Sequence, residues 1–271
     1  MTADPVPAIS ETDATGATAD LYADIRSTLG VGVVNLIWRH LATMPGGLEW
    51  AWSATRPLYT SGAAEAEAAR LLADLDFPEL SKISSTALAD INIDGGSKET
   101  ILAVLDSYNR SNALNLMALS AFVAEPVAVE PSPPTPAALG QVARAIPGLP
   151  PLDGLAPDVR DLVLKLNGLG SREADPIVAS MYRHLSYWPG YLTLAWNLLA
   201  PVQEDGRLAM AIETTQSLSR SRAGGLAASL AKVTSPDAET AEAVRASVNR
   251  FADHAISRMV PIACMLRRAM E

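Results

Sequence analysis

The sequence predicts an all-α fold, built as an internally duplicated helical pseudo-dimer in which two similar helical lobes are joined by a proline-rich linker. Three observations predict it. First, 49% of the 271 residues are hydrophobic but only 5% are aromatic, so aliphatic side chains and alanine must build the core, which favours helices packed closely on helices. Second, apolar residues recur at helical spacing, and alternating strand patterns are nearly absent. The third observation is an internal repeat.

The repeat is clearest around two tryptophans. Residues 37–58 (IWRHLATMPGGLEWAWSATRPL) and residues 181–202 (MYRHLSYWPGYLTLAWNLLAPV) match at a constant offset of 144. Within this register Trp52 falls on Trp196. Tryptophan is a rare residue, so a matched pair in register indicates duplication.

The repeat divides the chain into four segments. We predict a disordered or extended N-terminal arm over residues 1–16, a first helical repeat over 17–124, a Pro-rich linker over 125–155 and a second helical repeat over 156–271. The linker contains the run EPSPPTP. Proline lacks an amide hydrogen and clashes with the preceding helical turn, so this run cannot continue a helix.

The first repeat opens with a helix that carries Leu21, Ile25 and Leu29 at helical spacing. We expect this helix to end at the glycines Gly30 and Gly32. A helix C-cap explains this pair better than a phosphate-binding loop, which would follow a strand. A second helix and, after a Pro-Gly corner, a third helix follow at the same spacing.

The longest helix of the first repeat is predicted to start near Ser97, a good N-cap residue after two glycines. Its inward face includes Asn112, with Asn115 beside it. A buried amide without a partner costs about 1 to 3 kcal/mol, so these side chains must find partners. The other members of the inward face are Leu105, Tyr108, Leu119 and Phe122.

In the second repeat, Asp175 and Pro176 predict a helix over residues 176–187, with aspartate at the N-cap and proline at the first helical position. A later helix is expected to be kinked by Pro261. The inward face of the first of these helices carries Ile177, Met181, His184 and Trp188, and that of the later helix carries Val244, Val248, Phe251 and Ala255.

Charge, cysteine content and missing motifs exclude several function classes. A net charge of −9 repels phosphate backbones, so no nucleic-acid partner is expected. Cys264 is the only cysteine, which excludes an internal disulfide and a CxxC zinc or redox motif. No run approaches the roughly 18 to 20 apolar residues that span a bilayer, so we expect no membrane association and a cytoplasmic protein. HExxH, P-loop and Rossmann motifs are absent, and no metal or cofactor is expected.

Two of the three histidines, His40 and His184, are repeat partners. They could flank a site as acid and base near neutral pH, but a packing contact inherited with a duplicated fold explains them more simply. Asn112 differs, because the second repeat carries Ala252 at its position, with an offset of 140. We expect either a special task for Asn112 or a fixed buried polar contact that sets helix register.

Together these features are similar to the DL-type (group I) 2-haloacid dehalogenase family, an all-helical family of internally duplicated proteins. The resemblance spans most of the chain and is carried by LATMPGGLEWAW, YNRSN, ASMYRHLSYWPG and LLAPV. It implies metal-free hydrolysis of the carbon–halogen bond of a small 2-halocarboxylate, by a water molecule that an aspartate activates.

The resemblance also implies site residues. Asn112 matches an assisting asparagine of the family, and Ser180 matches the serine immediately before the catalytic aspartate. The aspartate itself is replaced by Met181, whose thioether cannot deprotonate water. Pocket positions of the family fall on Val33, Leu36 and Val248.

Two functions stay open from the sequence. The first is a hydrolase with altered catalytic residues, acting on carbon–halogen bonds in a cleft between the repeats; its catalytic candidates are Asn112, His184 and Asp175. The second is a non-catalytic small-molecule-binding homologue with an apolar pocket between the repeats. The expected ligand is a small carboxylate, whose charge Arg183 or the N-terminal amides of the 176–187 helix would offset. A homodimer is left open. The candidate substrate-binding residues are Val33, Leu36, Ile37, Tyr108, Ser180, Met181, Arg183 and Val248.

Overall fold

A computed structural model of the chain describes residues 6–127 and 145–271. Every regular element within these ranges is a helix, which confirms the predicted all-α class. None of the described helices is long and apolar enough to cross a membrane. In chain order the helices are α1 (Gly16–Leu29), α2 (Leu36–Leu41), α3 (Gly47–Thr60), α4 (Ala63–Asp74), α5 (Ser85–Asp90), α6 (Gly95–Val123), α7 (Pro157–Gly168), α8 (Ser180–Leu185), α9 (Pro189–Glu204), α10 (Arg207–Ala227), α11 (Ala238–Arg250), the π-helix η1 (Phe251–Ile256) and α12 (Ser257–Ala269).

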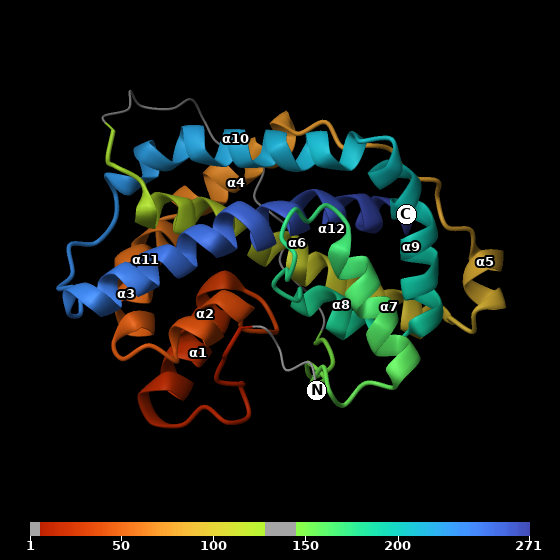
Figure 1. The fold of residues 1–271 in the computed structure, drawn as a ribbon, viewed down its shortest axis with the longest axis horizontal. Coiled ribbons are helices and arrows are strands. Elements are labelled where there is room, and N and C mark those ends of the chain that lie inside the picture. The colour runs from red at the N-terminus through yellow and green to blue at the C-terminus, as the bar shows by residue number, and fades with distance from the viewer. Residues whose placement is uncertain (1–5, 128–144) are drawn as a thin grey trace.

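The long helix α6 crosses the middle of the molecule, and the other helices are arranged around it (Figure 1). It packs against α3, α4 and α8 and also against α10, α11 and α12. Nearly all of its side chains from Ala103 to Phe122 are buried, including the whole inward face predicted from the sequence. A helix that is buried on all sides lies in the centre of a core. One hydrophobic cluster therefore joins residues of both predicted repeats.

Helix positions follow the sequence repeat in two places. Helices α2 and α8 are both six residues long, and their starts at Leu36 and Ser180 differ by 144 positions. The starts of α4 and α10, at Ala63 and Arg207, differ by the same number. The duplication itself stays a prediction. Of the predicted linker, residues 128–144 lie outside the described residues.

The described part of the N-terminal arm is held against α1 and α2. The Ile9 main chain donates to the Arg39 carbonyl at 3.0 Å, and the Tyr22 hydroxyl donates to the Ile9 carbonyl at 3.0 Å. The Glu11 carboxylate accepts from the Val34 main-chain N–H at 2.8 Å. These contacts bring the arm to the N-terminal end of α2.

Two helix boundaries differ from the sequence prediction in simple ways. The α6 N-cap is Asp94, not Ser97, because the Asp94 carboxylate accepts from the Ser97 main-chain N–H at 2.7 Å and draws the preceding glycines into the first turn. By contrast, the end of α1 is as predicted. Gly30 has a left-handed φ of 65°, and its N–H donates to the Arg26 carbonyl.

The predicted 176–187 helix is wrong at its start, since α8 begins only at Ser180 and Asp175 does not cap it. The cause is a side chain on α7. Asn167 accepts from the Ala179 N–H at 3.0 Å and donates to the Ile177 carbonyl at 3.2 Å. Arg258 also donates to the Ile177 carbonyl, at 3.3 Å. These bonds take the main-chain groups that a helix would use, so the segment before Ser180 is not helical.

Pro261 lies inside α12, and the kink predicted there stays a prediction. The irregular stretch of this long helical run is the π-helix η1, which ends directly before α12. A π-helical stretch shifts the register of the side chains that follow it. Phe251, Ala255 and Ile256 of η1 are buried.

We predict that Asn167→Ala lowers the free energy of unfolding by about 2 to 3 kcal/mol, because it leaves the Ala179 N–H and the Ile177 carbonyl short of partners in a buried place. Urea denaturation followed by circular dichroism measures this. Asn197→Ala on the exposed face of α9 is the matched control and should change stability by less than about 0.5 kcal/mol. Equal effects of the two substitutions would contradict the account of the 176–179 segment.

Candidate functional site

A small cavity lies between α2, α6 and α8 and the run from η1 to α12, where elements of the two predicted repeats meet. Its volume is about 40 Å³, which is room for about three water molecules. The residues that line it are Asn35, Leu36, Ile37, Tyr108, Asn112, Ile177, Ala179, Ser180, Met181, Phe251, Ala255, Ile256 and Met259.

The structure brings together six of the candidate residues from the sequence. They come from three separate helices, and each lines this cavity. They are Leu36, Ile37, Tyr108, Asn112, Ser180 and Met181. Their roles stay predictions, but their convergence on one cavity is a property of the fold.

The other candidates lie away from the cavity wall. Val33 and Val248 are buried in the core and do not line it. Arg183 sends its guanidinium to the Pro150 carbonyl, with N–O distances of 3.1 and 2.8 Å. Asp175 is exposed, and its main-chain carbonyl accepts from Arg250 at 3.3 Å. Since Asp175 neither caps α8 nor lines the cavity, it is not placed to act as a base there.

His184 stands directly behind the cavity wall. Its Nε2 lies 3.0 Å from the Pro147 carbonyl, and its Nδ1 lies 2.6 Å from the Tyr108 hydroxyl. A carbonyl only accepts, so Nε2 carries the proton and Nδ1 accepts the proton of Tyr108. Burial lowers the pKa of His184 to about 4. The ring is therefore neutral at physiological pH, and its lone pair is already in use.

A line of polar side chains runs along this wall. Arg39 donates from Nη2 to the Ser180 hydroxyl at 3.0 Å. Tyr108, which lines the same cavity as Ser180, donates to His184 at 2.6 Å. His40, by contrast, is bound to the Pro7 carbonyl and to Ser247, and so it holds the N-terminal arm.

The wall is electropositive. Arg39 is only 5% exposed, and its hydrogen-bond partners, the Val34 carbonyl and the Ser180 hydroxyl, are neutral. None of the described carboxylates forms an ion pair with it. Burial raises the pKa of Tyr108 far above its usual value; the charges of Arg39 and Arg183 oppose that rise, and the smaller effect of the Glu11 charge adds to it. The positive potential of the two arginines therefore reaches a side chain that lines the cavity, partly offset by Glu11.

Two amide side chains in the lining have unsatisfied atoms. Asn112 is 6% exposed and its Nδ2 has no partner; Asn35 is 7% exposed and its Oδ1 has none. The Nδ2 of Asn35 donates to Ser111 on α6 at 2.9 Å. Asn115, which does not line the cavity, accepts from Trp38 and Tyr59 through its Oδ1, at 3.2 and 2.9 Å, and so links α2 and α3 to α6; its Nδ2 is also buried without a partner.

Sequence reasoning missed Asn35 and Arg39. Asn35 occupies the N-cap position of α2 without a capping bond, and an asparagine at a helix start is normally explained as a cap. Arg39 lies in the repeated segment 37–58 and received no prediction of its own. One sequence signal could have identified it. Arg39 lies on a six-residue helix, LIWRHL, whose other residues are apolar or His. A short helix of this composition is buried, and its cation is buried with it.

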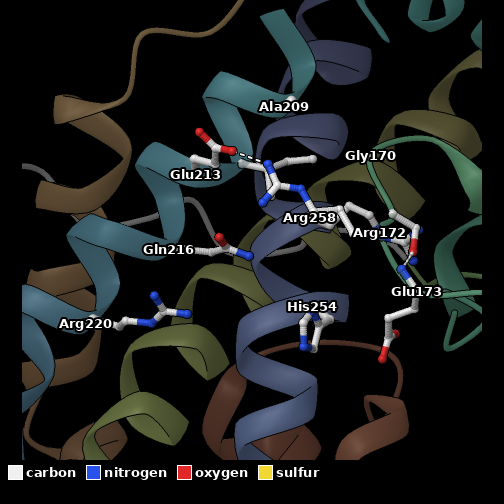
Figure 2. Close-up of a pocket in the computed structure, with 11 residues that line it drawn as sticks. Gly170, Arg172, Glu173, Ala209, Glu213, Gln216, Arg220, His254 and Arg258 are labelled. Carbon is white, nitrogen blue, oxygen red and sulfur yellow. Dashed lines mark hydrogen bonds and ion pairs between the residues drawn. The ribbon is translucent and has the colours of Figure 1, made fainter. Parts of the chain in front are cut away.

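A larger cleft of about 310 Å³ lies between α10 and the run from η1 to α12. Figure 2 shows Glu213, Gln216 and Arg220 of α10 facing His254 and Arg258 across it. Its charges are already matched, since Glu213 is paired with Arg172 and Arg220 with Asp253. The terminal N–H groups of Arg258 donate to oxygens of Asn167, Leu169 and Ile177. This cleft is therefore held by its own contacts, and none of the candidate residues lines it.

Comparison with solved structures gives the fold. Three structures match with probability 1.00: a D-2-haloacid dehalogenase in complex with L-LA (TM-score 0.74, 16% identity), a mutant of a D-2-haloacid dehalogenase (TM-score 0.73, 16% identity) and such a mutant in complex with D-2-CPA (TM-score 0.66, 15% identity). The first two cover 98% of this chain and the third covers 96%, and the match covers 96% of each of their chains. The chain has the fold of a 2-haloacid dehalogenase. No protein-family model matches it, and no curated protein matches it by sequence.

Within this dehalogenase fold the small cavity is poor in ionisable groups. Tyr108 is the only titratable side chain among the described residues that line it, and burial keeps its hydroxyl protonated. Across the described residues, no group of three or more His, Cys, Asp and Glu side chains is arranged to hold a metal ion. The chemistry of the cavity thus rests on hydrogen bonds from neutral groups and on the positive potential behind them.

We predict that His184 makes the protein less stable in mild acid. The unfolded chain takes up a proton near the ordinary pKa of 6.5, but the folded chain does so only near 4. The free energy of unfolding should therefore fall as the pH drops from about 6.5 to about 4, by about 3 kcal/mol. Denaturation curves across this range measure the loss. His184→Gln should remove that part of the loss, whereas His254→Gln, at an exposed position, should keep it; an unchanged pH profile in His184→Gln would refute the prediction.

Proposed function

We propose that the cavity between α2, α6 and α8 binds a small carboxylate, and that the chain does so without hydrolysing a carbon–halogen bond. The observation that carries the proposal is the buried cation Arg39, one hydrogen bond behind the cavity wall through Ser180. A buried charge is costly unless an opposite charge approaches it. An anion in the cavity would supply that charge.

The dimensions of the cavity limit the ligand to a short chain. Its free volume of about 40 Å³ suits a molecule of a few heavy atoms after small side-chain movements. The lining includes the apolar side chains of Met181, Ile256 and Met259. It also includes the polar side chains of Asn112 and Ser180, which can hold a polar end. A carboxylate with one short apolar substituent suits both kinds of lining group.

Hydrolysis of a 2-halocarboxylate is the second candidate, and the whole-chain likeness to solved dehalogenases favours it. Its difficulty is the base. A water molecule in the cavity could reach His184 only through Tyr108, and a histidine with a pKa of about 4 is a weak acceptor for a proton at neutral pH. The described lining offers no carboxylate in its place. Binding is therefore the better-supported function.

We predict that propionate and 2-chloropropionate stabilise the protein in thermal-shift titrations. Arg39→Gln should weaken their affinity about tenfold or more, because it removes the positive potential at the wall. Arg39→Lys keeps the charge and should lose less. Arg207→Gln, at an exposed ion pair with Asp205, is the surface control and should bind normally. If no small carboxylate stabilises the protein at concentrations up to about 100 mM, which is far above a typical millimolar Kd, the proposal is wrong.

We also predict that the chain releases no halide from 2-chloropropionate and that Met181→Asp gains this activity. A carboxylate at this position would face the cavity and could accept a proton from water, which a thioether cannot. Ion chromatography of free chloride is the measurement, and a gain on the order of 100-fold over background is expected. Met181→Leu controls for the loss of methionine. Halide release by the unaltered chain would instead establish the second candidate.

A further inference from the structure

The most informative unsatisfied atom in the cavity is an acceptor. Asn35 Oδ1 is buried, lies in the lining and receives no hydrogen bond. Its own Nδ2 is fixed to Ser111 at 2.9 Å, so the amide is oriented with Oδ1 left over. A buried carbonyl oxygen without a donor carries the full cost of its lost hydration.

The neighbouring unsatisfied atom is a donor. Asn112 follows Ser111 on α6, and its Nδ2 is also buried, in the same lining and without a partner. The cavity therefore offers one free acceptor and one free donor from side chains that α6 holds close together. A carboxylate can satisfy Asn112 but not Asn35, because an ionised carboxylate has no hydrogen to give.

We infer that the cavity selects small carboxylates that also carry a hydrogen-bond donor, either a hydroxyl or a primary amide, which donates to Asn35 Oδ1. The inference rests on the proposed binding of a carboxylate and adds its specificity. A halogen at the same carbon has a similar size but no hydrogen to donate, so it leaves the Asn35 oxygen unsatisfied. The cavity distinguishes the two kinds of ligand because the halogenated one leaves a buried polar atom without a hydrogen bond.

Isothermal titration calorimetry with three ligands tests this inference. Lactate carries a hydroxyl, oxamate carries a primary amide, and 2-chloropropionate carries neither while matching lactate in shape. We expect lactate, oxamate or both to bind about tenfold or more tightly than 2-chloropropionate. Preference for lactate alone identifies the hydroxyl as the donor, and preference for oxamate alone identifies the amide.

Two variants locate the effect. Asn35→Leu removes the acceptor and should bring the affinities to within about twofold of one another, while 2-chloropropionate still binds. Ser111→Ala is the comparison variant, because it removes the Asn35–Ser111 hydrogen bond that orients the amide but keeps Oδ1, and it should weaken the preference less than Asn35→Leu does. If Asn35→Leu does not fold, the comparison of ligands on the unaltered chain still decides.

Equal affinities of the unaltered chain for lactate, oxamate and 2-chloropropionate would overturn the inference, while the proposed binding of a carboxylate would stand. Equal affinities are also expected if a water molecule permanently bridges the amides of Asn35 and Asn112. A preference that persists in Asn35→Leu would overturn it as well. Failure of all three ligands to bind would remove the proposed function itself, and the inference with it.

Discussion

The burial of α6 on every side is the constraint on which the rest of the structure depends. A helix in this position brings its polar side chains into the core, and each must be matched from a neighbouring element. Asn115 accepts hydrogen bonds from Trp38 and Tyr59, and Tyr108 donates to His184 of the second predicted repeat. The polar positions of α6 therefore decide how α2, α3 and α8 approach it. Four polar atoms among the described residues of α6 are nevertheless buried without a partner, namely Ser107 Oγ, Asn109 Oδ1, Asn112 Nδ2 and Asn115 Nδ2, and of these residues Asn112 lines the cavity.

The electrostatics of the cavity follow from the same burial. His184 is neutral because desolvation, helped by the charges of Arg183 and Arg39, lowers its pKa, although the hydrogen bond to the Pro147 carbonyl acts in the opposite direction. Arg39 has neutral oxygens as its hydrogen-bond partners. The wall therefore has a cation behind it, and its described lining contains no carboxylate or imidazole. These two observations support the proposal that the cavity holds a ligand without activating water.

The helical class and the residues around the cavity could be predicted because both depend on local pattern. Spacing of apolar residues predicted the inward face of α6, and the resemblance to a family pointed to six side chains that line one cavity. The start of α8 could not be predicted. Asp175 and Pro176 are good start signals, but Asn167 and Arg258 take the main-chain groups that follow. Asn167 lies on the preceding helix, 12 residues before Ala179, and Arg258 lies 81 residues after Ile177. Arg39 and Asn35 were missed for the same reason, because their importance comes from partners that only the tertiary structure brings near.

The segment just before the second half has a consequence beyond connecting the chain. Its carbonyls at Pro147 and Pro150 fix the ring of His184 and the guanidinium of Arg183. A connector that selects the tautomer of a core histidine is under chemical constraint at individual main-chain atoms. A change in the length of this segment would therefore alter which ring nitrogen of His184 carries the proton, even where no helix moves.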